Sequence, residues 1–166
     1  MLIILSGLPG TGKTTIAREL ARSLGAVHVR IDSIEEAIDR SGIAARPMND
    51  AGYRVAYAVC EDNLRLGLTV IADSVNPLTI TRDAWMEVAR RAGVPFANVE
   101  VVCSDATEHR GRIETRPRVA GSRSLTWEDV LAREYHRWME PRITIDTAHL
   151  SVHDAVVMIR SLLPAR

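Results

Sequence analysis

Residues 7–14 read GLPGTGKT, and their types and spacing suit them to hold phosphate groups. They match the pattern G-x-x-x-x-G-K-[ST] at every fixed position. Glycines let backbone N–H groups approach phosphate oxygens, and the ammonium of Lys13, the only lysine in the chain, can reach β- and γ-phosphates. The hydroxyl of Thr14 is a ligand for Mg²⁺. We therefore predict that a nucleoside triphosphate binds to Leu8, Pro9, Gly10, Thr11, Gly12, Lys13, Thr14 and Thr15.

Two carboxylates follow apolar runs of the kind that form buried strands. Asp32 comes after residues 26–31, and Asp73 comes after residues 69–72. In a parallel sheet the carboxyl ends of the strands share the edge where ligands bind. Asp32 could there accept the proton of an acceptor hydroxyl, and Asp73 could hold Mg²⁺ together with Thr14. The alternatives are structural: Asp32 or Ser33 as the cap of the next helix, and Asp73 as a turn former.

A third group of polar residues is the arginine-rich stretch after the fourth apolar run. Arg112 and Arg116 are four residues apart, so they share a helical face, and Pro117 makes Arg116 the expected last residue of that helix. The sequence RPRVAGSRS at 116–124 predicts a surface loop. We interpret residues 106–125 as a lid whose arginines stabilise a phosphoryl group in transfer. The alternative is a solvated face with the ion pairs Glu108–Arg112 and Glu114–Arg118.

These residues need a scaffold in which strands and helices alternate. Short apolar runs without polar alternation predict buried parallel strands at residues 2–5, 26–31, 69–72, 99–103 and 143–145. Amphipathic patterns predict helices at 13–24, 50–66, 79–92 and 151–163. A capping box at 126–129 predicts a further helix with Leu131, Tyr135 and Trp138 on one face. We expect one α/β domain over residues 1–166.

The composition narrows the classes of function. Acidic and basic residues balance at 21 each, so a nucleic-acid partner is possible but not favoured. We find no apolar run long enough to span a membrane and no signal peptide, and we expect a cytoplasmic protein. A monomer and a homodimer are both compatible with the sequence.

The motifs together resemble the zeta-toxin/AAA_33-like P-loop kinases. The resemblance rests on GLPGTGKTT at 7–15, Asp32, DSVN at 73–76, the spacing H-x-x-R-x-x-x-R at 109–116, and ITIDT at 143–147. This group is similar to chloramphenicol phosphotransferases, gluconate and shikimate kinases, and the kinase domain of polynucleotide kinases. The resemblance implies a three-layer fold with a five-stranded parallel sheet in the order 2-3-1-4-5, and ATP as the nucleotide.

The same resemblance implies roles for individual residues. Asp32 would be the catalytic base, Arg112 and Arg116 would grip phosphates, and the loop at 146–150 would border the adenine. Apart from the resemblance, we expect the segment at about 33–66 to bind the acceptor, and it matches no known substrate class. The candidate contacts are Arg46 and Tyr53 of this segment, for which surface or core roles are the alternative, and Asn76 of the DSVN motif. One departure from the pattern is Gly111, which weakens the lid helix by about 1 kcal/mol.

The sequence thus predicts an ATP- and Mg²⁺-dependent phosphotransferase acting on a hydroxyl of a small molecule. Its catalytic residues would be Lys13, Asp32, Arg112 and Arg116. Two alternatives stay open: a kinase for nucleotides or polynucleotide 5′-hydroxyls, and a regulatory ATPase switch without an acceptor.

Overall fold

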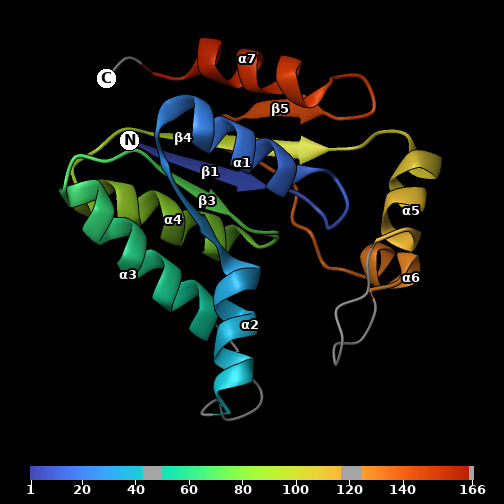
Figure 1. The fold of residues 1–166 in the computed structure, drawn as a ribbon, viewed down its shortest axis with the longest axis horizontal. Coiled ribbons are helices and arrows are strands. Elements are labelled where there is room, and N and C mark those ends of the chain that lie inside the picture. The colour runs from blue at the N-terminus through green and yellow to red at the C-terminus, as the bar shows by residue number, and fades with distance from the viewer. Residues whose placement is uncertain (43–49, 117–124, 165–166) are drawn as a thin grey trace.

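The chain folds around a parallel sheet with helices on both of its faces (Figure 1). The computed structural model describes residues 1–42, 50–116 and 125–164. The sheet has five strands in the order β2-β3-β1-β4-β5, and each neighbouring pair is parallel. The strands are β1 (Leu2–Ser6), β2 (Val27–Arg30), β3 (Val70–Asp73), β4 (Phe96–Val102) and β5 (Ile143–Asp146). The predicted architecture and strand order are confirmed.

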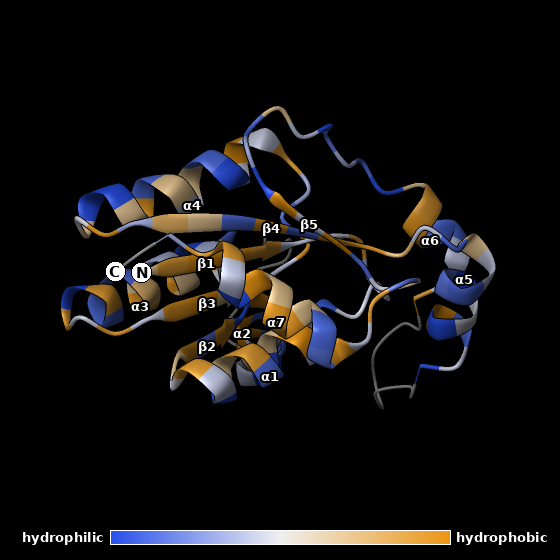
Figure 2. Cartoon of the chain, turned by 90° about the horizontal axis from the view of Figure 1, so that it is seen from above, coloured by the Kyte–Doolittle hydropathy of each residue, from blue (hydrophilic) through white to orange (hydrophobic). Residues whose placement is uncertain are grey.

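Alternate residues of β1 enter two separate cores, as the two-residue period of a strand requires. Leu2 and Ile4 pack in one core with helices α3 (Ala51–Arg65) and α4 (Thr79–Arg91), whereas Ile3 and Leu5 pack in the other with α1 (Lys13–Leu24) and α7 (Val152–Leu162). Strand β1 is accordingly mostly hydrophobic in Figure 2. The helices are α1 (Lys13–Leu24), α2 (Ile31–Ser41), α3 (Ala51–Arg65), α4 (Thr79–Arg91), α5 (Ala106–Glu114), α6 (Trp127–Leu131) and α7 (Val152–Leu162).

The start of α2 differs from the prediction. The second strand ends at Arg30, which is the N-cap residue of α2, and the helix begins at Ile31. The side chain of Ile31 is 3% exposed and packs in the core with α3 and α4, so core packing fixes where the helix begins. Asp32 and Ser33 therefore lie inside the first turn, and the interpretation of either as the helix cap is wrong. Asp32 instead stands near the positive end of the helix dipole.

The region after the lid is shorter in helix than predicted. The capping box is confirmed, because Thr126 accepts from the Asp129 N–H and donates its own N–H to the Asp129 carboxylate. However, α6 ends at Leu131, which is 67% exposed. The helical face predicted for Leu131, Tyr135 and Trp138 is therefore wrong.

A buried arginine explains why this helix stops. Arg82 of α4 is fully buried and donates to the carbonyls of His136 (2.8 Å) and Pro77 (3.1 Å). Its guanidinium also lies 4.0 Å from the centre of the Trp138 ring. Because backbone carbonyls and the indole of residues 136–138 contact Arg82, this segment packs against α4 rather than continuing α6.

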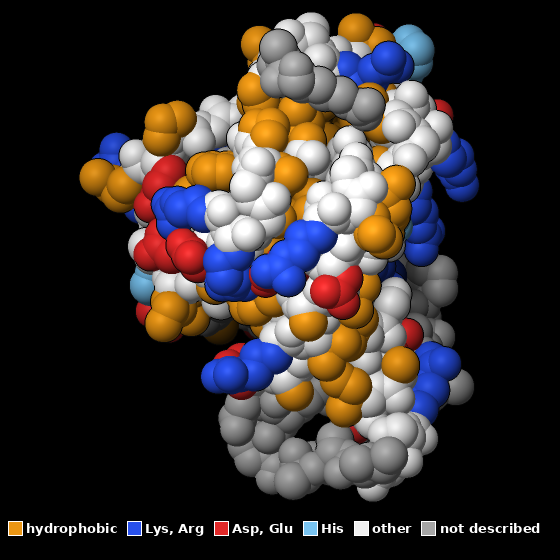
Figure 3. All heavy atoms as spheres, turned by 90° about the vertical axis from the view of Figure 1, so that its left-hand side faces the viewer, with side chains coloured by type: hydrophobic (Ala, Val, Ile, Leu, Met, Phe, Trp, Pro, Cys, Tyr) orange, Lys and Arg blue, Asp and Glu red, His pale blue; other side chains and the backbone are white. Residues whose placement is uncertain are grey.

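The end of the molecule farthest from α5 and α6 shows basic and acidic side chains next to each other, with hydrophobic ones between them (Figure 3). This mixture agrees with the balanced net charge. Within the described ranges, no helix has the length and hydrophobicity needed to cross a bilayer.

Candidate active site

A cavity of about 710 Å³ lies where the predicted motifs meet, at the carboxyl ends of the strands. Its walls come from the glycine loop, α1, the first turn of α2, the end of β3, the lid and the loop after β5. It brings together ten of the predicted residues, which are Pro9, Gly10, Gly12, Lys13, Thr14, Thr15, Asp32, Asp73, Arg112 and Arg116. Leu8 and Thr11 do not line it: Thr11 is buried, and the Leu8 carbonyl accepts hydrogen bonds from Thr11 and Lys13.

Three residues of the glycine loop, Gly7, Gly10 and Gly12, have a positive φ, and at the first two a Cβ would also clash with neighbouring atoms. Gly7 has φ +142°, and a Cβ there would lie 2.1 Å from the carbonyl oxygen of Val101. Gly10 has φ +84°, and a Cβ there would lie 2.6 Å from Ile113 of α5. The loop leads directly into α1, whose N-terminus and dipole face the cavity and suit it to bind an anion.

Lys13 stands in this anion site with its side chain enclosed. It is 7% exposed, and its Nζ donates to the Leu8 carbonyl at 2.9 Å. Burial lowers the pKa of Lys13 to about 8, although the charges of Asp73 and Asp32 favour the ammonium form. A phosphate beside the ammonium would compensate for its lost hydration.

Asp73 is a buried carboxylate, 2% exposed, at the end of β3. Burial by itself would raise its pKa, but hydrogen bonds from His28 and Thr14 and the charge of Lys13 hold the pKa of Asp73 below its usual value. An ionised carboxylate beside a threonine hydroxyl provides the oxygen ligands that Mg²⁺ prefers. Outside this pair, the described residues contain no cluster of three or more His, Cys, Asp or Glu that could bind a metal. The donors present therefore fit a magnesium ion shared with a nucleotide.

Asp32 lines the same cavity from the first turn of α2. Its side chain is 48% exposed, and its Oδ2 accepts a hydrogen bond from Arg30 at 2.5 Å. The carboxylate thus remains open to the cavity while one of its oxygens is fixed.

Arg112 connects the lid to both the glycine loop and the end of β5. It donates to the hydroxyl (2.7 Å) and the carbonyl (3.0 Å) of Thr147, and that hydroxyl donates to the Thr11 carbonyl at 3.0 Å. The predicted ion pair with Glu108 is present at 2.6 Å. Thr147 and Leu150, from the loop at 146–150, line the cavity.

Arg116 lies beyond the helix that was expected to contain it. Helix α5 ends at Glu114, and the Thr115 N–H bonds to the Gly111 carbonyl at the C-cap. Arg116 nonetheless lines the cavity. Glu114 pairs with Arg110 at 2.6 Å. Its predicted partner Arg118 lies outside the described residues, as does the rest of the lid at 117–124.

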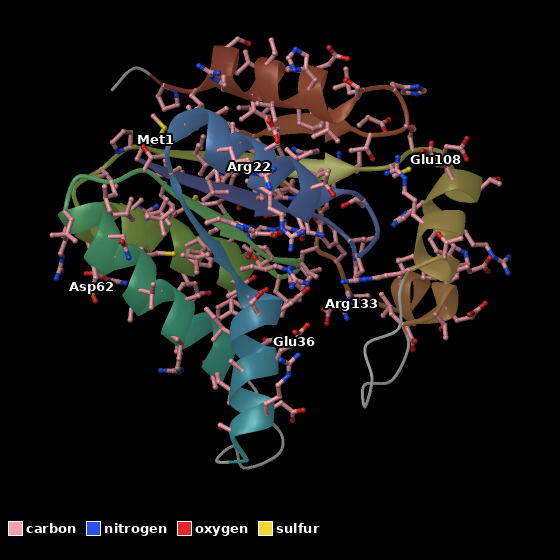
Figure 4. All side chains as sticks on the ribbon, in the orientation of Figure 1. Met1, Arg22, Glu36, Asp62, Glu108 and Arg133 are labelled. Carbon is pink, nitrogen blue, oxygen red and sulfur yellow. The ribbon has the colours of Figure 1, made fainter. Side chains whose placement is uncertain are left out.

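The sequence did not point to Arg133, which lines the cavity from the segment after α6. In Figure 4 Arg133 lies on the lid side of the space that α2, marked by Glu36, borders on the other side. Its position depends on the end of α6 at Leu131. The helical spacing of Leu131, Tyr135 and Trp138 had predicted a longer helix.

His109 of α5 fixes the lid against the glycine loop. It is 6% exposed, its Nε2 lies 2.7 Å from the Pro9 carbonyl, and its ring meets that of Trp127 edge to face. Because a carbonyl only accepts, Nε2 carries the hydrogen. His109 is part of the lid motif in the sequence, which predicted no role for it, and the structure shows that it connects α5 to the glycine loop.

Tyr53 and Asn76, which were predicted to contact the acceptor, form hydrogen bonds next to the cavity instead of lining it. Asn76 is fully buried with φ +49°; its amide donates to Ser6 at 2.9 Å, and its N–H donates to the Tyr53 hydroxyl at 3.2 Å. Neither side chain lines the cavity, whereas Ser74 and Val75 of the same loop do. Arg46 lies outside the described residues.

Comparison with known proteins places this site in a family. The chain is similar to a cytidylate kinase of Ignicoccus hospitalis, at 27% identity over 163 residues that cover 94% of this chain and 88% of that protein. It also superposes on the APS kinase of Mycobacterium tuberculosis, solved in complex with AMPPNP and APS. The TM-score is 0.74 at 19% identity, over 97% of this chain and 95% of that chain.

A gluconokinase of Sinorhizobium meliloti superposes with a TM-score of 0.66 at 17% identity, over 97% of this chain and 92% of that chain. At these identities the two structures establish a shared fold. The AAA_33 family model, described as an AAA domain, matches residues 2–141. That match includes the glycine loop, both aspartates and the lid, and so the chain belongs to the AAA_33 family of P-loop kinases.

Proposed function

We propose that this chain is an ATP- and Mg²⁺-dependent kinase that transfers the γ-phosphoryl group to a hydroxyl of a small molecule. The observation that carries the proposal is the position of Asp32. Its carboxylate opens into the same cavity as Lys13 and the N-terminus of α1, where a base could meet both an acceptor hydroxyl and a phosphate.

In this proposal the glycine loop binds the nucleotide phosphates through backbone N–H groups, and Lys13 neutralises the β- and γ-phosphates. Thr14 and Asp73 would hold the metal ion. When bound, Mg²⁺ neutralises charge on the phosphate oxygens and orients them for displacement. Thr147 and Leu150 would border the base of the nucleotide.

The chemical step needs one proton acceptor and several fixed cations. Asp32 accepts the hydroxyl proton as the acceptor oxygen bonds to the γ-phosphorus and the bond from that phosphorus to the ADP oxygen breaks. Arg112 and Arg116 stabilise the negative charge that spreads over the phosphoryl oxygens. Hydrogen bonds to Thr147 hold Arg112 in place, so part of the positive charge that stabilises the phosphoryl oxygens is preorganised.

A second candidate follows from the relative: a cytidylate kinase transfers to a nucleotide, and it matches 94% of this chain. The exposure of Asp32 favours the hydroxyl acceptor. Its carboxylate is 48% exposed and lines the cavity, so it can accept a hydrogen bond from an acceptor hydroxyl. A phosphate acceptor has no need of a proton acceptor at this position.

An acceptor screen tests the proposal. ADP release would be measured with Mg-ATP and sugars, sugar acids, aminoglycosides, chloramphenicol-like compounds, nucleosides, CMP and a 5′-hydroxyl oligonucleotide. Release that one hydroxyl class stimulates, and that Lys13→Ala and Asp32→Asn abolish, supports the proposal. Stimulation by CMP alone would favour the nucleotide kinase, and release that no acceptor changes would favour the regulatory ATPase.

A further inference from the structure

The sequence of strand β2, VHVR, alternates between apolar and polar residues. It is an edge strand, paired with β3 alone in the described sheet. Its two polar residues, His28 and Arg30, are separated by one residue and therefore point to the same face. Such side chains on an edge strand commonly point to solvent, but these two do not.

His28 reaches the carboxylate at the end of the neighbouring strand. Its Nε2 lies 3.1 Å from Oδ2 of Asp73, and the His28 side chain is only 20% exposed. Since an ionised carboxylate only accepts, Nε2 carries the hydrogen and donates it. One oxygen of Asp73 is thus occupied by β2, which restricts how the carboxylate can turn toward Thr14.

Arg30 does the same for the other carboxylate of the site. Its Nη2 lies 2.5 Å from Oδ2 of Asp32, and its Nη1 donates to the Ser33 hydroxyl at 3.2 Å. The Arg30 side chain is 16% exposed, whereas that of Asp32 is 48% exposed. A half-exposed aspartate on a helix would otherwise sample several rotamers. The guanidinium holds it in the one that opens into the cavity.

We infer that His28 and Arg30 are positioning residues: β2 presents two donors that fix Asp73 and Asp32, the proposed metal ligand and the proposed base. This inference rests on the proposed function of those two aspartates. The physical reason is that a misplacement of about 1 Å in a catalytic group reduces the rate on the order of 10²-fold. Residues that orient a metal ligand typically change metal affinity about 10–100-fold when removed.

The Arg30 half is tested by kinetics with the acceptor found in the screen. Arg30→Ala is expected to lower kcat about 10–100-fold, with KM for Mg-ATP unchanged within about twofold, and Arg30→Lys to restore part of the rate. In an Asp32→Asn background, Arg30→Ala should have no further effect on kcat. The matched control is Arg65→Ala, which removes a 2.5 Å ion pair with Glu61 on α3, away from the cavity.

The His28 half is tested without turnover, by the shift in melting temperature that Mg²⁺ produces in the presence of ADP. His28→Ala is expected to raise the Mg²⁺ concentration for half of that shift about 10–100-fold, and His28→Gln to recover part of it. In an Asp73→Asn background, His28→Ala should no longer change the Mg²⁺ concentration for half of the shift. His153→Ala, at an exposed position of α7, is the control.

Three results would overturn the inference. The first is wild-type behaviour of Arg30→Ala and His28→Ala. The second is that Arg30→Ala lowers kcat, or His28→Ala weakens the Mg²⁺ response, by the same factor when the partner aspartate is already replaced by asparagine. The third is that kcat falls in proportion to the decrease in melting temperature in all variants, including Arg65→Ala. If the wild-type protein phosphorylates no acceptor, the proposed function fails and the Arg30 half with it, while the Mg²⁺ titration still decides the His28 half.

Discussion

Nucleotide binding should take up a proton from solution, because burial lowers the pKa of Lys13 and the phosphates of a bound nucleotide would raise it again. Burial lowers the pKa of Lys13 to about 8 in the free protein. If the phosphates of Mg-ADP return it to about 10.5, the bound lysine is fully protonated at pH 7–9. The expected uptake is then about 0.1 proton at pH 7, about 0.5 at pH 8 and about 0.9 at pH 9.

The sign of the pH dependence follows from the same shift. The complex binds more protons than the free protein between pH 8 and 10.5, so affinity falls as pH rises through this window. We expect Mg-ADP to bind about fivefold more weakly at pH 9 than at pH 8. Isothermal titration calorimetry in two buffers of different ionisation enthalpy measures the uptake directly.

The control variant for this experiment is Lys13→Met, which keeps the length of the side chain and removes its charge. It should take up no proton in the same pH range, although it binds more weakly. Uptake that is equal in both proteins, or that falls from pH 7 to pH 9, would refute the reasoning about Lys13.

Three further predictions concern the base, the glycine loop and α2. Asp32→Asn should lower the rate of transfer about 10²–10⁴-fold while Mg-ADP affinity stays within about twofold, measured by steady-state kinetics and calorimetry; a rate within threefold of wild type would exclude Asp32 as the base. Gly7→Ala should destabilise the fold by more than about 3 kcal/mol in urea titrations, because its Cβ would lie 2.1 Å from the Val101 carbonyl oxygen. Gly25→Ala, at φ +60° with open space around it, should cost only about 1 kcal/mol. Glu35→Gln should raise the melting temperature at pH 7, with the gain shrinking toward pH 4, because a carboxyl whose pKa is raised in the fold loses stability as pH increases through its titration; a gain that does not depend on pH would contradict this.

The elements that sequence predicted well are those with local signals. The conformation of the glycine loop is signalled by its own residues. The strands β1, β3 and β4 are buried on both faces, so each is recognisable as an apolar run without knowledge of the strand that it pairs with. The strand order came from the resemblance, and the parallel pairing confirms it.

The elements that were predicted wrongly depend on contacts distant in sequence. Helix α6 stops because Arg82 binds carbonyls more than 50 residues away, and nothing near Leu131 signals this. Helix α2 begins at Ile31 because of core packing rather than because of a capping side chain.

The site shows the same division. Lys13, Thr14, Asp32 and Asp73 were recognisable from short motifs and meet in one cavity. Arg133 was not, since its place in the wall depends on a chain path that no local pattern encodes. The roles of His28 and Arg30 likewise appear only when β2 and β3 are placed side by side.

The most direct test of the central claim is the chemical identity of the phosphorylated product. Wild-type protein would be incubated with Mg-ATP and the acceptor that most stimulates ADP release, and the product examined by phosphorus NMR. A new phosphomonoester signal, absent with Asp32→Asn, is the predicted result. A diphosphate signal, or inorganic phosphate alone, would contradict a hydroxyl acceptor activated by Asp32.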